Sequence, residues 1–136
     1  MDFEKLAERL IPGEYPSLES FEKQYPPRDL PAKAEVTRLA PSPTGFIHLG
    51  NLFVAIANER IAHQSGGTLY LRIEDTDLKR KVDGAVEAVI AALDYFDIRF
   101  DEGAEIDGTN AYGPYYQRRR AEIYRAYAKD LIRRGR

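Results

Sequence analysis

The sequence predicts an α/β fold, in which a parallel sheet is built from strand–helix–strand units. A short alternating strand at residues 35–39 and a strand rich in β-forming residues at Thr68–Ile73 are separated by a helical pattern. A second helical pattern follows, and at 136 residues the chain suits one domain with a buried core. Ligands of such sheets gather beyond the carboxyl ends of the strands, so the segments that follow these strands are of most interest.

Residues 1–34 are predicted to form a short helical N-terminal extension to a domain of residues 35–136. Pro12-Gly13 ends the first helix. Four apolar residues share one face of this helix: Phe3, Leu6, Leu10 and Ile11. A second helix is predicted from Ser17 to Gln24, with Ser17 as its N-cap. We expect both helices to pack on the main domain; a recognition arm is the alternative.

The main domain begins with the strand at Glu35–Leu39, and a helix follows from about His48 to Gln64. Apolar residues recur in this helix at helical spacing: Leu49, Leu52, Phe53, Ile56 and Ile61. Gly66-Gly67 is expected to end it with a left-handed cap. The strand Thr68–Ile73 then leads into an acidic cluster.

A further amphipathic helix is marked by apolar residues from Val82 to Phe96, and Asp97–Phe100 is predicted as a short third strand. Residues 101–116 are rich in turn-forming residues. The last helix is predicted at about Gln117–Arg133, and four of its residues are expected to face inward: Ile123, Tyr124, Tyr127 and Leu131. Its basic side is expected to be a solvent face, with nucleic-acid contact as the alternative: Arg118, Arg125, Lys129, Arg133 and Arg136.

The composition excludes several classes of protein. The absence of cysteine removes disulfides and thiolate zinc sites and fits a cytoplasmic location, and the sequence predicts no metal site. No apolar run approaches the roughly 20 residues that span a bilayer, so no membrane association is expected. The net charge of −2 does not indicate nucleic-acid binding by the whole surface, so any RNA contact requires a local patch.

The stretch Arg38–Asn51, RLAPSPTGFIHLGN, has the order strand, turn and helix start. Helix N-terminal N–H groups lack partners and carry partial positive charge, so this order favours binding of a phosphate group. His48 stands at the helix mouth and can donate a further hydrogen bond to a phosphate oxygen, or it is a histidine of the N-cap region with no ligand. Gly45 and Gly50 permit close approach of a ligand or of another strand.

Two charged residues follow the strands. Arg38 can receive a carboxylate with its planar fork, or it is simply an exposed strand arginine. Glu74 can bind an ammonium group or a metal, or it belongs to a solvated acidic loop in which Asp75 and Asp77 are N-cap candidates for the next helix. His63 is expected to be solvated or to complement the helix dipole. Because PSPTGFIH and EDTD follow neighbouring strands, we expect them to face one crevice.

RLAPSPTGFIHLGN followed by LRIEDTD closely resembles the N-terminal half of the catalytic domain of class I glutamyl-tRNA synthetases. YGPYYQRRRAEIYRAYAKDLIRRGR resembles their next segment, so the resemblance covers about residues 36–136. It implies half of a Rossmann-like parallel-sheet domain. Glutaminyl enzymes resemble the chain less. The paralogue that glutamylates a modified tRNA base is closer, but it usually lacks the intact EDTD and GPY..QR pairing.

The resemblance implies roles for individual residues. His48 and Gly50 match the catalytic HIGH signature, whose last histidine is Asn51 here. The residues implied to bind ATP are Pro43, Thr44, Gly45, His48, Gly50 and Asn51. Those implied for glutamate are Arg38 on the side-chain carboxylate, Ala40 and Ser42 along the pocket, and Glu74 on the α-ammonium group. Thr76 and Asp77 match positions near the terminal adenosine of tRNA.

The implied activity is ATP-dependent activation of L-glutamate and its transfer to tRNA(Glu), with Mg²⁺ accompanying ATP. The alternatives are the tRNA-modifying paralogue and a non-catalytic nucleotide-binding fragment. The family's KMSKS-type loop and anticodon-binding domain have no counterpart before Arg136, so we expect a segment of a longer, monomeric synthetase that binds ATP without turnover. A sheet without its remaining strands leaves an open apolar edge, so self-association, a swapped element or cover from residues 1–34 is expected.

Overall fold

The computed structural model describes residues 2–45, 47–80, 82–106 and 111–136; the predicted turn-rich segment therefore lies partly outside the described residues. The chain forms two compact units. We call Arg28–Arg118 the α/β unit, and Met1–Pro27 together with Arg119–Arg136 the helical unit. These boundaries differ from the division at residue 34, and the division into an extension and a catalytic domain stays a prediction.

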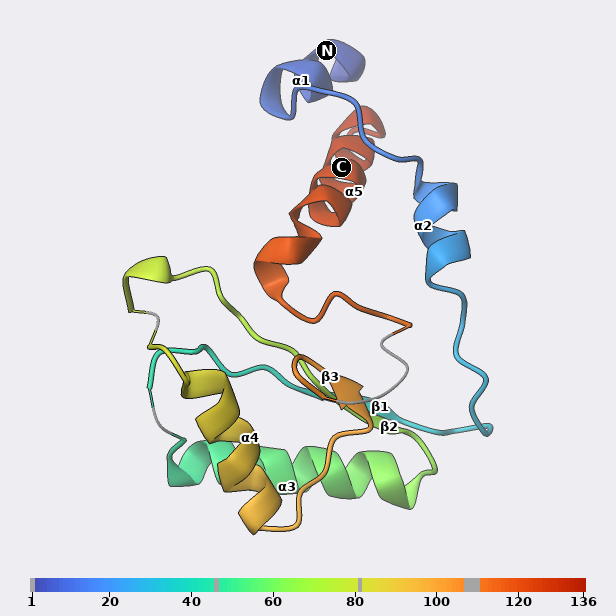
Figure 1. Ribbon diagram of the computed structural model, residues 1–136. Coiled ribbons are helices and arrows are strands. Elements are labelled where there is room, and N and C mark those ends of the chain that lie inside the picture. The colour runs from blue at the N-terminus through green and yellow to red at the C-terminus, as the bar shows by residue number, and fades with distance from the viewer. Residues whose placement is uncertain (1, 46, 81, 107–110) are drawn as a thin grey trace. The chain divides into compact units, whose positions relative to one another are not determined.

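The α/β unit contains a three-stranded parallel sheet, which confirms the predicted fold class (Figure 1). Its strands, in the spatial order β1-β2-β3, are β1 (Val36–Leu39), β2 (Thr68–Leu71) and β3 (Glu102–Gly103). Leu71 of β2 lies opposite Leu39 on one side and Gly103 on the other. Leu71 is fully buried because it lies on the central strand and packs in the apolar core of the unit.

Two helices join the strands, α3 (Leu49–Gln64) between β1 and β2 and α4 (Ala85–Tyr95) between β2 and β3. They lie on the same side of the sheet (Figure 1), as right-handed crossovers require for this strand order. A short 3₁₀-helix, η1 (Leu78–Arg80), precedes α4, which begins at Ala85 rather than at Val82. The core between helices and sheet is apolar and includes Leu39, Leu69, Ile73, Val86, Val89 and Leu93.

The inner face of α3 differs from the one that the apolar spacing predicted. Its fully buried residues are Ala55 and Ala62, because small side chains let the helix approach the sheet closely. Of the predicted apolar residues, Leu52 is partly buried and packs against the core, whereas Phe53 and Leu49 lie outside and are 72% and 80% exposed. The other exposed apolar residues of this helix are Val54, Ile56 and Ile61. We call these five exposed residues the outer face of α3.

The predicted left-handed cap of α3 is confirmed at Gly66, whose φ is +72°. The Gly67 N–H donates to the Ala62 carbonyl at 2.8 Å and the Gly66 N–H donates to the His63 carbonyl at 3.2 Å, which is the Schellman pattern. Gly67 meets a second constraint, because a Cβ there would lie 1.9 Å from the Glu35 carbonyl oxygen. This close approach carries the chain directly from the end of α3 into β2.

The third strand lies later than predicted, at Glu102–Gly103 instead of Asp97–Phe100. Asp97 has φ +56° and Ile98 donates its N–H to the Leu93 carbonyl at 3.0 Å, so both residues belong to the cap that ends α4. Gly103 is required where β3 pairs with the central strand β2, because a Cβ there would lie 2.7 Å from the Leu71 carbonyl oxygen.

A buried charge pair that the sequence did not indicate secures β3. Glu102 is 4% exposed and pairs with the Arg28 guanidinium, which also lies 3.9 Å from the centre of the Tyr112 ring. Burial raises the pKa of the nearby Tyr115 hydroxyl, and the Glu102 carboxylate raises it further. Arg28 therefore ties the start of the α/β unit to its third strand.

His63 is not simply solvated. Its Nδ1 lies 3.0 Å from Glu59 Oε1 and its Nε2 lies 3.0 Å from Asp101 Oδ2, so the ring bridges two carboxylates. The same Asp101 oxygen accepts the Leu69 N–H at 2.7 Å. The hydrogen bond to Asp101, followed by that to Glu59, raises the pKa of His63. The imidazole thus links the last turn of α3 to the segment that enters β3.

The helical unit contains α1 (Phe3–Leu10), α2 (Leu18–Gln24) and α5 (Ala121–Arg133), and both α1 and α2 contact α5. The Ser17 side chain accepts the Ser20 N–H at the start of α2, which confirms the predicted N-cap. In α1 the buried residue is Ala7, whereas Phe3 and Leu10 of the predicted apolar face are 40% and 60% exposed. Residues 117–120 form a 3₁₀-turn before α5, which therefore begins later than predicted.

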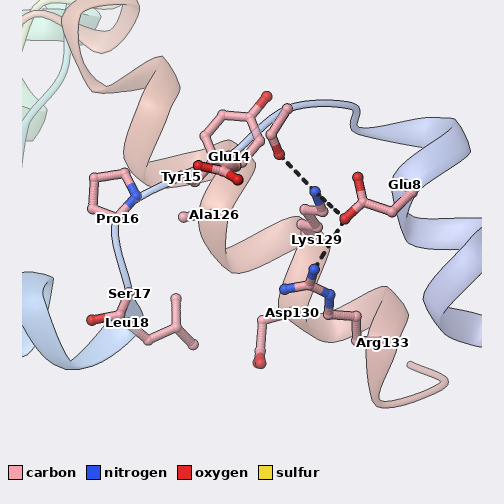
Figure 2. Close-up of a pocket in the computed structure, with 11 residues that line it drawn as sticks. Glu8, Glu14, Tyr15, Pro16, Ser17, Leu18, Ala126, Lys129, Asp130 and Arg133 are labelled. Carbon is pink, nitrogen blue, oxygen red and sulfur yellow. Dashed lines mark hydrogen bonds and ion pairs between the residues drawn. The ribbon is translucent and has the colours of Figure 1, made fainter.

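The packed face of α5 also differs from the prediction. Ala126 and Lys129 are buried, whereas Tyr124, Tyr127 and Leu131, predicted to face inward, are 38–50% exposed. Lys129 was expected on a solvent face. Its Nζ instead donates to the Gly13 carbonyl at 2.7 Å and lies 2.6 Å from Glu8 Oε1 (Figure 2).

Arg133 adds a second cation to this contact, 3.1 Å from the same Glu8 oxygen and 2.8 Å from Glu4. The hydrogen bond from Lys129 holds the pKa of Glu8 below its ordinary value. These residues border a hollow of about 740 Å³ between α1, the segment that follows it and α5 (Figure 2). The sequence pattern missed the contact because a lysine is rarely buried unless a partner distant in the chain receives it.

The outer face of α3 and the free edge of β1 predict self-association of this chain. Exposed apolar surface of this kind usually finds a partner, and an edge strand presents unpaired backbone groups. Light scattering across a concentration series should give a mass above that of the monomer. The substitution Phe53→Glu should lower the measured mass, whereas Arg60→Glu, at an exposed position on the same helix, should not. A clean monomer at all concentrations would contradict this prediction.

The substitution Lys129→Met should lower the free energy of unfolding by about 1–3 kcal/mol, because it leaves the Gly13 carbonyl and Glu8 without their buried donor. Urea denaturation measures the change. The matched control is Arg125→Met on the exposed side of α5, for which a change within about 0.5 kcal/mol is expected. Equal effects of the two substitutions would show that the buried contact does not stabilise the unit.

The raised pKa of His63 makes part of the stability depend on pH. Because the folded value lies above the unfolded one of about 6.5, the contribution is complete below that pH and is lost as pH rises through the folded pKa. His63→Gln should therefore destabilise the protein most at about pH 5.5–6 and least at alkaline pH, as measured by urea denaturation at a series of pH values. A constant difference across the series would contradict the linkage.

Candidate active site

The turn after β1 lies against the segment that leaves β2. Glu74 donates its N–H to the Pro41 carbonyl at 3.0 Å, and Val82 donates its N–H to the Pro43 carbonyl at 2.9 Å. The Arg72 N–H continues the sheet by donating to the Leu39 carbonyl at 2.9 Å. The two sequence clusters, PSPTGFIH and EDTD, therefore lie side by side at the carboxyl ends of neighbouring parallel strands, as expected.

A hollow of about 380 Å³ opens beside this turn. Its lining comes from the turn, the start of α3 and one residue of α4, and consists of Ala40, Pro41, Ser42, Thr44, Gly45, Ile47, His48, Asn51 and Val89. Most of the residues predicted to bind nucleotide thus surround one space. A Cβ at Gly45 would meet no described atom within 4 Å, so this glycine faces open space rather than another strand.

His48 is the N-cap of α3. Its Nδ1 accepts the Gly50 N–H at 3.1 Å, and its own N–H donates to Asn51 Oδ1 at 3.2 Å. These two bonds satisfy backbone donors at the start of the helix in the manner of a capping box. The imidazole is therefore held at the positive end of a 16-residue helix, on the rim of the hollow.

Arg38 and Glu74 lie opposite one another as an ion pair. Arg38 Nη1 is 3.7 Å from Glu74 Oε1, and the two side chains are 40% and 37% exposed. Exposed pairs at this distance contribute little to stability, so a ligand can exchange for either partner at low cost. Neither residue is among those that line the hollow at His48. The described residues thus form two adjacent groups, one with an imidazole and a helix N-terminus and the other with an arginine and a glutamate.

The remaining acidic residues serve the local backbone. Asp77 Oδ1 accepts the N–H groups of Lys79 and Arg80 at the start of η1, and a hydrogen bond from the Arg80 side chain lowers the pKa of Asp77. Asp77 thus caps this 3₁₀-helix and not α4, whose N-cap is Gly84. Thr76 is exposed beside it. The implied contact of Thr76 and Asp77 with tRNA stays a prediction.

The sequence did not indicate how the YGPYYQR segment contacts this site. The Asp75 carboxylate accepts the Arg118 N–H at 2.9 Å. Ile73, the predicted end of the second strand, forms a parallel bridge with Tyr116 beyond the end of β2. These contacts join the YGPYYQR segment to the acidic one. Backbone pairing between segments so distant in the chain leaves no local signal in the sequence.

The described part of the chain contains no group of three or more His, Asp or Glu side chains that could hold a metal ion. Among the same residues, no helix is both long enough and apolar enough to cross a membrane.

The family model for the catalytic domain of class I tRNA synthetases for E and Q, glutamate and glutamine, matches residues 35–136. A glutamate–tRNA ligase of Acetivibrio thermocellus is 57% identical over 138 residues, which is 100% of this chain and 25% of that protein. One from Thermus thermophilus is 45% identical over 74% of this chain and 21% of that protein. The chain therefore spans about a quarter of the length of the curated relatives that it matches.

Solved structures give the same result. The glutamate–tRNA synthetase of Elizabethkingia anophelis covers 73% of this chain with a TM-score of 0.67 and 38% identity, and the match spans 20% of that protein. A glutamate–tRNA ligase of Elizabethkingia meningosepticum, solved in complex with its amino acid, matches with a TM-score of 0.67 and 39% identity over 74% of this chain and 20% of that one. On the strength of the family match over residues 35–136, this chain belongs to the class I tRNA synthetases for glutamate and glutamine.

Proposed function

We propose that this chain supplies the nucleotide- and glutamate-binding part of a glutamate–tRNA ligase, which activates L-glutamate with ATP and transfers it to tRNA(Glu). The observation that carries the proposal is the Arg38–Glu74 pair beside a helix N-terminus that His48 caps. The curated relatives described above are glutamate–tRNA ligases, which favours this activity over that of the tRNA-modifying paralogue.

The phosphate groups of ATP bind in the hollow at the start of α3. The helix N-terminus and the His48 ring favour negative charge, and they stabilise it as the glutamate carboxylate attacks the α-phosphate. Pro43, Thr44 and Gly45 shape the turn over which the nucleotide lies, and Gly50 leaves the first helical turn open. Mg²⁺ enters with ATP, and its charge offsets that of the phosphates.

Glutamate binds at the Arg38–Glu74 ion pair. The Arg38 fork receives the side-chain carboxylate, Glu74 receives the α-ammonium group, and Ala40 and Ser42, which line the adjacent hollow, contact the substrate beside them. A zwitterionic ligand replaces both partners of the pair at once, so neither charge is left alone. Glutamine, with a neutral amide, leaves the arginine uncompensated and is rejected for that reason.

The proposal is tested by binding and exchange assays on this chain. Calorimetry should detect ATP, and pyrophosphate exchange with glutamate and tRNA(Glu) separates a working catalyst from a module that only binds. We expect ATP binding with exchange below that of a complete relative. No binding of ATP or of glutamate at millimolar concentration would overturn the proposed function.

Arg38→Gln should weaken glutamate binding by about 100-fold, because it removes the buried partner of the substrate carboxylate in the complex. Glu74→Gln should weaken glutamate similarly and leave glutarate, which lacks the ammonium group, unaffected. Arg60→Gln, an exposed arginine on α3, is the matched control and should change neither. Equal losses for glutamate and glutarate in Glu74→Gln would contradict the assigned role of Glu74.

A further inference from the structure

The start of α3 determines which nitrogen of His48 carries the proton. A neutral imidazole has one N–H and one acceptor nitrogen. Because Nδ1 accepts the Gly50 N–H at 3.1 Å, the proton of the neutral ring must reside on Nε2. From these contacts we propose that Gly50 and Asn51 are positioning residues that hold His48 as the Nε2–H tautomer, ready to donate to an anionic ligand. This inference rests on the proposed function for the identity of the ligand, but not for the tautomer itself.

Gly50 acts in two ways. Its N–H is the donor that occupies Nδ1, and its missing side chain makes room for the ring. A Cβ at this position would lie 3.0 Å from His48 Cε1 and 3.1 Å from Nδ1, closer than ordinary packing permits. Alanine or any larger residue therefore requires the imidazole to shift by a few tenths of an ångström, which weakens its hydrogen bond to the residue 50 N–H. The glycine at this position is thus explained by the side chain of a neighbour, since its own φ is not in the left-handed region.

Asn51 fixes the backbone from which the ring projects. Its Oδ1 accepts the His48 N–H at 3.2 Å, and this bond holds His48 in the extended conformation of an N-cap, with φ −115° and ψ 170°. An amide oxygen at this position is an acceptor at every pH. The second half of the cap therefore persists while the ring takes part in ligand binding.

Asn51 also lines the hollow, so direct contact with a ligand is the competing explanation for any effect of its replacement. A double-mutant cycle distinguishes direct contact from a positioning role. If Asn51 acts through His48, Asn51→Ala should weaken ATP binding about 3- to 10-fold in the wild-type background and leave affinity unchanged in the His48→Ala background. If it contacts the ligand itself, the two losses should add, and the positioning role would be wrong.

The tautomer can be observed directly. The chain has two histidines, so long-range ¹H–¹⁵N correlation spectra of the imidazole rings are simple to assign. In its neutral form, the His48 ring should show only the Nε2–H pattern in the wild type. Gly50→Ala and Asn51→Ala should introduce the Nδ1–H form, whereas Asn51→Asp, which keeps an acceptor oxygen, should restore the wild-type pattern.

His63 serves as the internal control, because it lies at the far end of α3 between Glu59 and Asp101. Its signals should be unchanged in every variant, which confirms that the fold is intact. A mixed tautomer for His48 in the wild type, or an unchanged spectrum in Gly50→Ala, would overturn the inference. These spectra need no ligand, so a failure of ATP to bind would count against the proposed function alone.

Discussion

The site depends on two backbone hydrogen bonds that join the turn after β1 to the segment after β2. The Pro41 carbonyl receives the Glu74 N–H and the Pro43 carbonyl receives the Val82 N–H. Proline supplies no N–H of its own, yet its carbonyl remains a full acceptor, so these two residues shape the turn and still anchor it. The pairing of β1 with β2 places Arg38 and Glu74 at the same edge of the sheet, and this junction fixes the turn and the acidic segment against one another.

The same two hydrogen bonds hold together a site in which positive and negative charges lie close to one another. Arg38 and Glu74 pair at 3.7 Å, and the anion-favouring N-terminus of α3 lies beside them under a polar imidazole. The net charge of −2 for the whole chain therefore gives no indication of what the site can bind. Local fields over a few ångströms decide recognition here, because charges on the remote surface are screened within about 10 Å at ordinary ionic strength.

Features governed by neighbours in the chain could be predicted from the sequence. The cap at Ser17, the glycine cap at Gly66 and the helix start at His48 each depend on residues within one turn, and the structure confirms all three. The crevice could also be predicted, because parallel strands place their carboxyl ends together. The strand predicted at Asp97–Phe100 was wrong because Asp97 adopts the left-handed conformation, more typical of glycine, and so ends α4.

Features governed by distant partners could not be predicted. Lys129 is buried because Glu8 and the Gly13 carbonyl receive it, and Arg28 turns inward because Glu102 lies beneath it. Hydrophobic spacing assigns such residues to solvent, since it measures side-chain polarity and contains no information about partners.

The reversed face of α3 follows from the geometry of the sheet and not from side-chain polarity. A helix that packs closely on two strands needs small residues at the contact, and Ala55 and Ala62 provide them. The larger Leu49 and Phe53 must then project outward, although they are the more hydrophobic residues. Exposing them costs free energy in an isolated monomer, about 25 cal/mol for each Å² of apolar surface left in water. The same packing that forms the core therefore also leaves an apolar surface of the kind to which other protein usually binds.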